Sequence, residues 1–332
     1  MIPEAPEERY KEVKEVGVKF GIVVPFERST DSRGSEFLSQ IMTYLSGLEN
    51  HFDSAWIPDH LVPFTPPFLG GTLECLTTIS YLLGIFKKFK FGSLVLCNSF
   101  RNPSLVAKIG ATLDFLTGGR FILGIGAGWN ESEYVQYGYS FPPPAVRIEQ
   151  LKEGVQIIKS MWSEGQVTFE GKYFRVKNAR CSPKPDPPPP IMIGGGGEKL
   201  TLKVVARYAD WWNLDWADLS TYEYKLDFLR HYCSRIGRDS NEIVKTLLGA
   251  VVIADTDEDA MKIAKKRIGY QNFTFRDLAR FVGSVDTVKA KIGEFVDIGV
   301  EHFILAFLPL PRLDGPLLFA KEVIPEFKQS KR

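Results

Sequence analysis

Residues 121–130 read FILGIGAGWN, an apolar run that leads into closely spaced glycines. A short apolar run bounded by glycine is typical of a buried strand, and glycines without side chains let another group approach the backbone closely. Amphipathic stretches with apolar residues near a 3.6-residue spacing stand on either side, at 103–116 and 147–162. A strand between two helices predicts parallel pairing through right-handed crossovers.

The same alternation continues outward in both directions and gives eight candidate strands. They are residues 16–24, 55–57, 89–96, 121–126, 191–193, 211–214, 246–253 and 302–307, with further helical stretches at 36–48, 200–208 and 285–296. Eight such units predict an α/β fold closed into a (β/α)8 TIM barrel, and a doubly wound open sheet is the alternative. A barrel needs roughly 250 residues plus insertions, so residues 1–332 are expected to form a single domain.

Two segments depart from the repeat and are expected as insertions at the C-terminal face of the barrel. In the first, about 165–190, residues 167–169 and 173–176 flank Glu170-Gly171-Lys172 as in a small hairpin, and a proline-rich run follows. The second, about 270–281, lies between the seventh and eighth units and could form a lid.

The composition points to small-molecule partners. Lys and Arg (41) nearly balance Asp and Glu (40), so no overall field favours nucleic acid or an anionic membrane. The apolar runs are far shorter than a membrane span, and residues 1–15 are charged and lack the apolar core of a signal peptide, so we expect a cytoplasmic protein. The four cysteines form no Cys-x-x-Cys pair and there is no His-x-His pair, so no metal site is expected.

Three places could carry chemistry: the glycine-rich stretch at 121–130, the pair Asp59 and His60, and residues 194–197. Asp59 and His60 follow a strand, where barrels hold catalytic groups, although Asp59 could equally cap a loop and His60 could simply pack. Residues 194–197 are four glycines between an apolar strand and a helix, which predicts an anion site with a flexible turn as the alternative. Neither glycine stretch completes a dinucleotide-binding or phosphate-loop motif.

Taken together, these segments resemble the luciferase-like superfamily, specifically its coenzyme F420-dependent branch. The densest likeness runs through TLDFLTGGR at 112–120 and GIGAGWN at 124–130 to Glu133, supported by WIPDH at 56–60 and the four-glycine strand end. The resemblance covers about 16–305. It implies a (β/α)8 barrel with an insertion after the fourth helix.

The resemblance also implies particular site residues. Asp59 and His60 would lie beside a deazaflavin as catalytic residues, and the peptide bond between Leu94 and Val95 would be cis, behind the ring. The expected cofactor-binding residues are Leu94, Val95, Cys97, Asn98, Gly126, Ala127, Gly128, Gly195, Gly196 and Gly197, and the expected substrate pocket is Phe26, Phe64, Trp129 and Trp216. In the sugar-phosphate branch of the family a tryptophan and a glutamate stand where this chain has Phe64 and Trp129, so a less polar substrate is expected.

The leading hypothesis is an F420-dependent oxidoreductase that transfers a hydride between the deazaflavin and a small organic substrate. The alternatives are an FMN-dependent monooxygenase supplied by a separate reductase, and a catalytically silent flavin-binding protein. The resemblance leaves a homodimer open.

Overall fold

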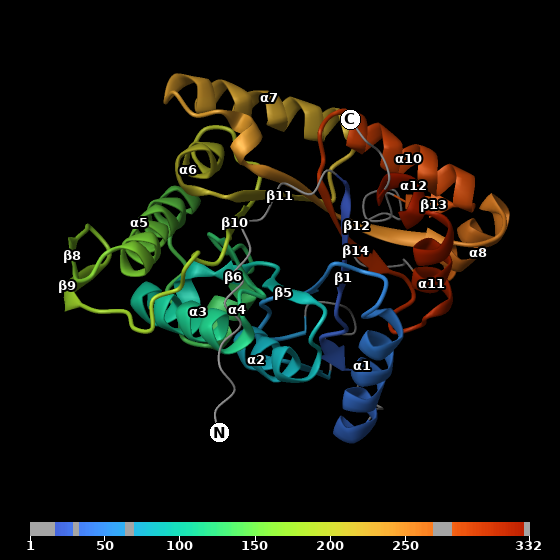
Figure 1. The fold of residues 1–332 in the computed structure, drawn as a ribbon, viewed down its shortest axis with the longest axis horizontal. Helices are drawn as coiled ribbons and strands as arrows, with labels where there is room; N and C mark the ends of the chain where they lie inside the picture. Colours follow the sequence, from blue (N-terminus) through green and yellow to red (C-terminus); the bar gives the residue numbers. More distant parts are fainter. Residues whose placement is uncertain (1–16, 29–32, 64–69, 268–280, 329–332) are drawn as a thin grey trace.

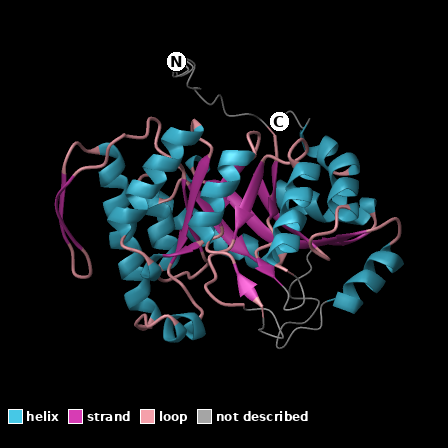
Figure 2. Ribbon diagram, turned by 90° about the horizontal axis from the view of Figure 1, so that it is seen from below, coloured by secondary structure: helices cyan, strands magenta, loops and turns pink. Residues whose placement is uncertain are grey.

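The chain folds as a closed barrel of eight parallel strands with helices around it (Figures 1 and 2). The computed structural model describes residues 17–28, 33–63, 70–267 and 281–328. In order around the barrel the strands are β1 (Lys19–Val23), β3 (Ser54–Ile57), β5 (Lys90–Ser93), β7 (Phe121–Gly126), β10 (Ile191–Gly194), β11 (Trp211–Asp215), β12 (Val244–Ile253) and β14 (His302–Phe307). Pairing of β7 with β10 and of β14 with β1 closes the ring, which excludes the open-sheet alternative.

Helices follow the strands and cover the outside of the barrel. They are α1 (Gly34–Leu48), α2 (Cys75–Ile85), α3 (Pro103–Thr117), α4 (Glu131–Gln136), α5 (Pro144–Ser163), α6 (Thr201–Tyr208), α7 (Leu219–Arg235), α8 (Asp257–Arg267), α10 (Val285–Asp297), α11 (Asp314–Glu322) and α12 (Ile324–Lys328). None of the helices in the described ranges is long and apolar enough to cross a membrane.

The local sequence explains where these helices begin and end. For α3, Asn102 Oδ1 accepts a hydrogen bond from the Ser104 amide at 2.9 Å, Pro103 occupies the first turn, and Gly118 ends the helix with φ 67°. These are the preferred residues at an N-cap, a first turn and a left-handed C-terminus.

Within the described residues, six shorter strands lie outside the barrel order. The antiparallel pair β8 (Val167–Glu170) and β9 (Arg175–Ala179) forms the predicted hairpin, which projects from the body of the molecule (Figure 2). A second antiparallel pair joins β2 (Glu27–Arg28) to β4 (Gly71–Thr72). Two more short strands extend the main sheet: β6 (Leu96–Cys97) pairs with β7, and β13 (Phe281–Gly283) pairs with β12.

The predicted strand 89–96 is wrong as a single element. It is divided into β5 and β6, and the cis peptide bond between Leu94 and Val95 lies between them, as the resemblance implied. Of the expected lid at 270–281, only Phe281 is described, in β13. Residues 270–280 lie outside the described residues, as does Val16 of the first predicted strand.

Side chains fill the barrel interior, which is therefore a packed core and not a pore. This interior cluster is separate from the larger core between strands and helices, and it consists of Val23, Trp56, Ile122, Met192, Ile304 and Ala306. Trp56 is fully buried, and a Cβ added at Gly21 or Gly92 would collide with its indole. Glycines on the two neighbouring strands thus make room for the largest side chain of the interior.

Candidate active site

One cavity of about 420 Å³ opens at the C-terminal ends of the barrel strands. Twelve of the residues predicted from the sequence line it: Asp59, His60, Leu94, Val95, Cys97, Gly126, Ala127, Gly128, Trp129, Gly195, Gly196 and Gly197. They come from the ends of different strands, which is how (β/α)8 barrels assemble active sites. The structure therefore brings together segments that are up to about 140 residues apart in sequence.

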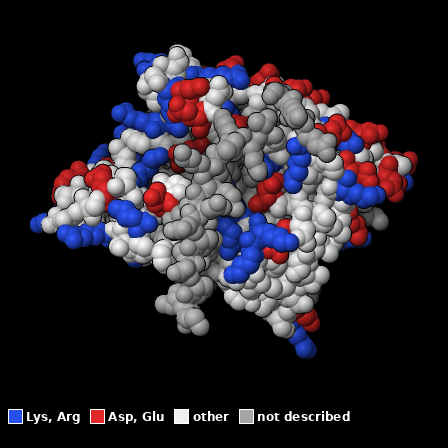
Figure 3. All heavy atoms as spheres, viewed as in Figure 1, with Lys and Arg blue, Asp and Glu red and all other residues white. Residues whose placement is uncertain are grey.

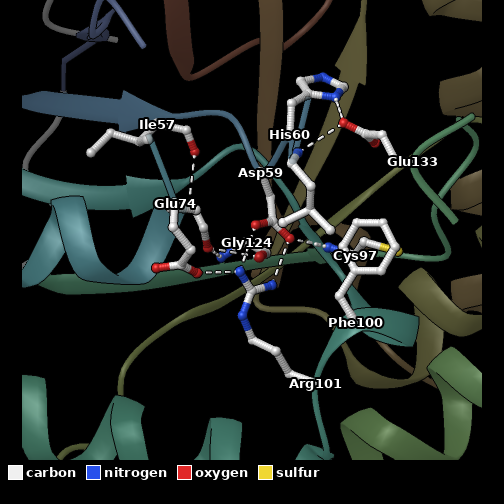
Figure 4. Close-up of polar contacts among 12 residues, drawn as sticks. Ile57, Asp59, His60, Glu74, Cys97, Phe100, Arg101, Gly124 and Glu133 are labelled. Carbon is white, nitrogen blue, oxygen red and sulfur yellow. Dashed lines mark hydrogen bonds and ion pairs between the residues drawn. The ribbon is translucent and has the colours of Figure 1, made fainter. Parts of the chain in front are cut away.

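Asp59 is buried in a dense set of hydrogen bonds at the end of β3 (Figure 4). Its Oδ2 accepts from Arg101 Nη1 at 2.7 Å and from the Cys97 amide at 2.8 Å, and its Oδ1 accepts from Arg101 Nη2 at 2.8 Å. Arg101 also pairs with Glu74. Burial alone would lower the pKa of Arg101, but the hydrogen bonds and charge of Asp59, and then of Glu74, raise it above its ordinary value.

These contacts hold Asp59 in place and position the residues around it. The bidentate pair with Arg101 fixes the carboxylate, and the bond to the Cys97 amide ties the end of β3 to the start of the next rim segment. The chain turns from Asp59 directly into His60, so this anchor also fixes where the His60 side chain begins.

His60 is oriented by Glu133, which lies in helix α4. Its Nδ1 lies 2.9 Å from Glu133 Oε1, and the same oxygen accepts from the Leu61 amide at 2.9 Å (Figure 4). Glu133 is only 3% exposed. Since the carboxylate accepts, Nδ1 is the donor, and the ring is fixed in the orientation that presents Nε2 on its other side.

Two aromatic rings pack around the His60 imidazole. Phe26 stacks with it at a centroid distance of 6.1 Å, and Trp129 meets it edge-on at 5.9 Å. Phe26 therefore supports the histidine, while Trp129 lines the cavity itself and is 65% exposed overall.

Cys97 forms the neighbouring part of the rim with Tyr134. The Cys97 sulfur lies 3.1 Å from the Tyr134 hydroxyl, which also donates to the Ala127 carbonyl at 3.3 Å. Burial raises the pKa of both the Cys97 thiol and the Tyr134 phenol. A thiol held neutral in this way is a poor nucleophile, so Cys97 serves as a wall of the cavity. Gly128 has φ 79°, and any side chain there would collide with both groups.

The four-glycine turn forms another end of the cavity. Gly195 has φ 119°, its amide donates to the Asn213 carbonyl at 3.0 Å, and its carbonyl accepts from Trp212 Nε1 at 3.0 Å. Within the described part of the chain, the amides of Gly196 and Gly197 donate to no protein acceptor. They lie just before α6, where unsatisfied amides and the helix dipole favour an anion.

Space at this turn is limited to glycine. A Cβ at Gly196 would lie 2.6 Å from Leu214 Cδ1, and one at Gly197 would lie 2.8 Å from Thr201 Oγ1. The Lys225 side chain lies at ordinary contact distance from the same place, where it pairs with Glu198. The turn therefore combines open backbone amides with a nearby cation, which suits a phosphate.

Not every predicted residue lines the cavity. Asn98 is buried behind it, Phe26 reaches it only through His60, and Phe64 lies outside the described residues. Trp216 is not among the residues that line the cavity either. Its amide donates to the Leu248 carbonyl at 2.9 Å, and its φ is 53°.

Sequence reasoning missed several residues of the site. Glu133 was part of the quoted signature but was given no role, and Asp215 and Arg147 were not singled out. Asp215 lines the cavity at the end of β11, and burial among protein atoms raises its pKa although its side chain is open to the cavity. Arg147 is buried, lies 3.9 Å from the Phe141 ring centroid and donates from Nη1 to the Pro142 carbonyl at 2.8 Å. Neither lies beside a recognisable motif, so only the folded chain reveals them.

The cavity has the features that a phosphorylated flavin or deazaflavin needs. Glycines at 126 and 128 and the small end of β10 leave a flat face, where a Cβ at Gly126 would lie 2.8 Å from Val95 Cγ2. The amides at 196 and 197 supply an anion site at one end. No group of three or more His, Cys, Asp or Glu side chains among the described residues could hold a metal ion.

A parallel barrel with a glycine-rich cavity on its C-terminal rim defines an enzyme of the (β/α)8 class. Within that class the chain belongs to the luciferase-like monooxygenase family, whose family model matches residues 18–281.

Three known proteins illustrate the likeness. The chain is 34% identical over 163 residues, 49% of its length and 48% of the relative's, to an F420-dependent glucose-6-phosphate dehydrogenase of Kineococcus radiotolerans. It is 32% identical over 200 residues, 58% of its length and 53% of the relative's, to the pyrimidine monooxygenase RutA of Acinetobacter baylyi. These alignments span about half the length of each relative.

The third is a solved structure, an F420-dependent secondary alcohol dehydrogenase in complex with an F420-acetone adduct. It matches with a TM-score of 0.78 at 21% identity and covers 94% of this chain and 98% of that one. This likeness establishes a shared fold.

Proposed function

We propose that the protein is an F420-dependent oxidoreductase acting on a small organic substrate. The observation that carries the proposal is a single cavity with an anion-binding glycine turn at one end and an oriented histidine at the other. Bound there, the deazaflavin would supply hydride transfer at its C5 position, and the protein would supply binding, orientation and proton handling.

The chain's own residues divide this work. The amides of Gly196 and Gly197 would bind the phosphate, and the flat glycine faces would admit the ring. His60, held by Glu133, would hold or move a proton at the reacting oxygen or nitrogen of the substrate through Nε2. Asp59 acts through the backbone, as a positioning residue.

The pocket suits a small organic substrate that combines an apolar body with a polar reacting group. Apolar Trp129, Phe100, Ile148 and Leu248 contribute to the cavity lining, together with polar residues such as Asn213 and Asp215. Apolar walls combined with polar groups that fix a ligand's orientation are typical of sites for small organic ligands. Secondary alcohols, aldehydes and imines are therefore the substrates to test first.

An FMN-dependent monooxygenase working with a separate reductase is the second candidate, because a monooxygenase is among the relatives and FMN would use the same anion site. A silent flavin-binding protein is the third. The intact contact between His60 and Glu133 favours an active enzyme over this last candidate.

Titration of the purified apoprotein with F420 and, separately, with FMN tests the proposal. Tight binding of F420, followed by its reduction or oxidation by one of the candidate substrates, would support it. Tight binding of FMN alone would favour the monooxygenase. Binding without turnover across the whole substrate panel would favour the silent protein.

A further inference from the structure

A second concavity of about 410 Å³ lies between α5, α6 and α7, on the outside of the barrel. We call it the basic groove. It is lined by Ile148, Glu149, Lys152, Leu200, Lys203, Val204, Ala206, Arg207, Tyr208, Tyr232, Arg235 and Ile236. Its lining combines aliphatic, aromatic and charged side chains.

The basic groove begins where the cofactor cavity ends. Ile148 lines both concavities. The first turn of α6 follows the glycine turn, and Leu200, immediately before α6, lines the groove. The groove then follows α6 to Tyr208, over about 12 Å at 1.5 Å per helical residue. A ligand with its phosphate at Gly196 and Gly197 would enter this groove if it continued past the phosphate.

The groove carries an excess of positive charge. Four of its side chains are cationic (Lys152, Lys203, Arg207 and Arg235) and only Glu149 is anionic. Figure 3 shows Lys and Arg side chains on the face over α5 and α6. Such a concentration of one sign attracts ligands of the opposite sign.

Most of this positive charge is not neutralised within the chain. Lys152 pairs with Glu149, at 3.5 Å from Nζ to Oε2. In the described ranges, Lys203, Arg207 and Arg235 have no carboxylate within 4.0 Å. Lys203 instead lies over the Tyr232 ring at 5.4 Å from its centroid, which leaves the ammonium group able to meet an anion.

We propose that the basic groove binds the anionic chain that F420 carries beyond its phosphate, a run of glutamate carboxylates. The inference rests on the proposed function and extends it to the distal part of the cofactor. FMN ends at its phosphate and cannot occupy the groove. The groove therefore contributes affinity for F420 and none for FMN, and this contribution weakens with salt because the charges are exposed.

The test compares two ligands and two matched variants. The ligands are F420 with several glutamates and a deazaflavin truncated after its phosphate, each titrated in low and high salt by quenching of cofactor fluorescence. In K203E/R207E, two exposed cations one helical turn apart are reversed. The control K262E/K265E makes the same charge change on exposed α8, on the other side of the barrel (Figure 1).

We expect K203E/R207E to bind full-length F420 about tenfold more weakly than the wild type, since each exposed ion pair contributes roughly 0.2 to 1 kcal/mol. Binding of the truncated deazaflavin should be unchanged in K203E/R207E, and the control should match the wild type with both ligands. High salt should remove the wild-type preference for the long chain.

Equal affinity of the wild type for both ligands, or an unchanged preference in K203E/R207E, would overturn the groove assignment while leaving the proposed cofactor in place. Failure of the wild type to bind either deazaflavin would overturn the proposed function and the groove assignment together. Circular dichroism of the variants establishes that any loss does not come from misfolding.

Discussion

Removal of the Arg101 side chain should destabilise the fold far more than removal of an ordinary surface arginine. In Arg101→Ala, Asp59 keeps only the hydrogen bond from the Cys97 amide, and its carboxylate stays at a side-chain exposure of 1%. Breaking a buried ion pair and stranding one charge costs about 3 to 5 kcal/mol. The contact with Glu74, whose side chain is 40% exposed, adds at most about 1 kcal/mol.

Equilibrium unfolding in urea measures this free energy. The matched control is Arg175→Ala, which breaks an ion pair to Glu170 in which the side chains are 81% and 69% exposed, and which should cost less than about 1 kcal/mol. The double variant Asp59→Asn with Arg101→Leu removes the stranded charge and should recover part of the loss. Equal effects of Arg101→Ala and Arg175→Ala, or no recovery in the double variant, would refute the reasoning.

Three further predictions concern the site and the core. His60→Ala should lower turnover about 100-fold to 10,000-fold with little change in the free energy of unfolding, and an early unfolding transition with wild-type turnover would show that the ring is structural. Gly196→Val should weaken cofactor binding at least about tenfold, or 1.4 kcal/mol, in a titration where Gly165→Val, which has open space around it, binds as the wild type does; equal affinities would contradict the anion site. Burial, and then two nearby lysines, lower the pKa of His302 to about 3 from an ordinary 6.5. Between these two pKa values the unfolded chain binds a proton that the folded chain does not, so the free energy of unfolding should fall with falling pH by up to about 1.4 kcal/mol per pH unit. In a series of urea unfolding measurements at different pH values, this dependence on pH should be weaker in His302→Gln and unchanged in the exposed control His231→Gln.

The barrel could be predicted from the sequence because its strands are short apolar runs that repeat with helical segments between them. All eight predicted strands correspond to barrel strands, and the family resemblance is confirmed. The error at 89–96 has a local cause: apolar Leu94, Val95 and Leu96 follow Ser93 directly, so the segment is predicted as one strand although Gly92 and Ser93 interrupt it.

The partners of the site residues could not be predicted, because they come from distant parts of the chain. Glu133 is 73 residues from His60, and Arg101 is 42 residues from Asp59. A carboxylate followed by a histidine gives no indication of which distant side chain will hold each of them. Asp59 therefore read as a catalytic candidate, whereas its contacts in the structure are those of an anchor.

The short helix α4 supports two residues of the rim, since Glu133 contacts His60 and the adjacent Tyr134 contacts Cys97. Both contacts depend on one six-residue element that lies outside the barrel strands. Replacement of residues 127–143 by the corresponding segment of a relative would thus exchange the support of the histidine and the wall around the thiol as one inherited module. Divergence of chemistry in this fold can proceed through that single loop, without any change to the strands that determine the stability of the barrel.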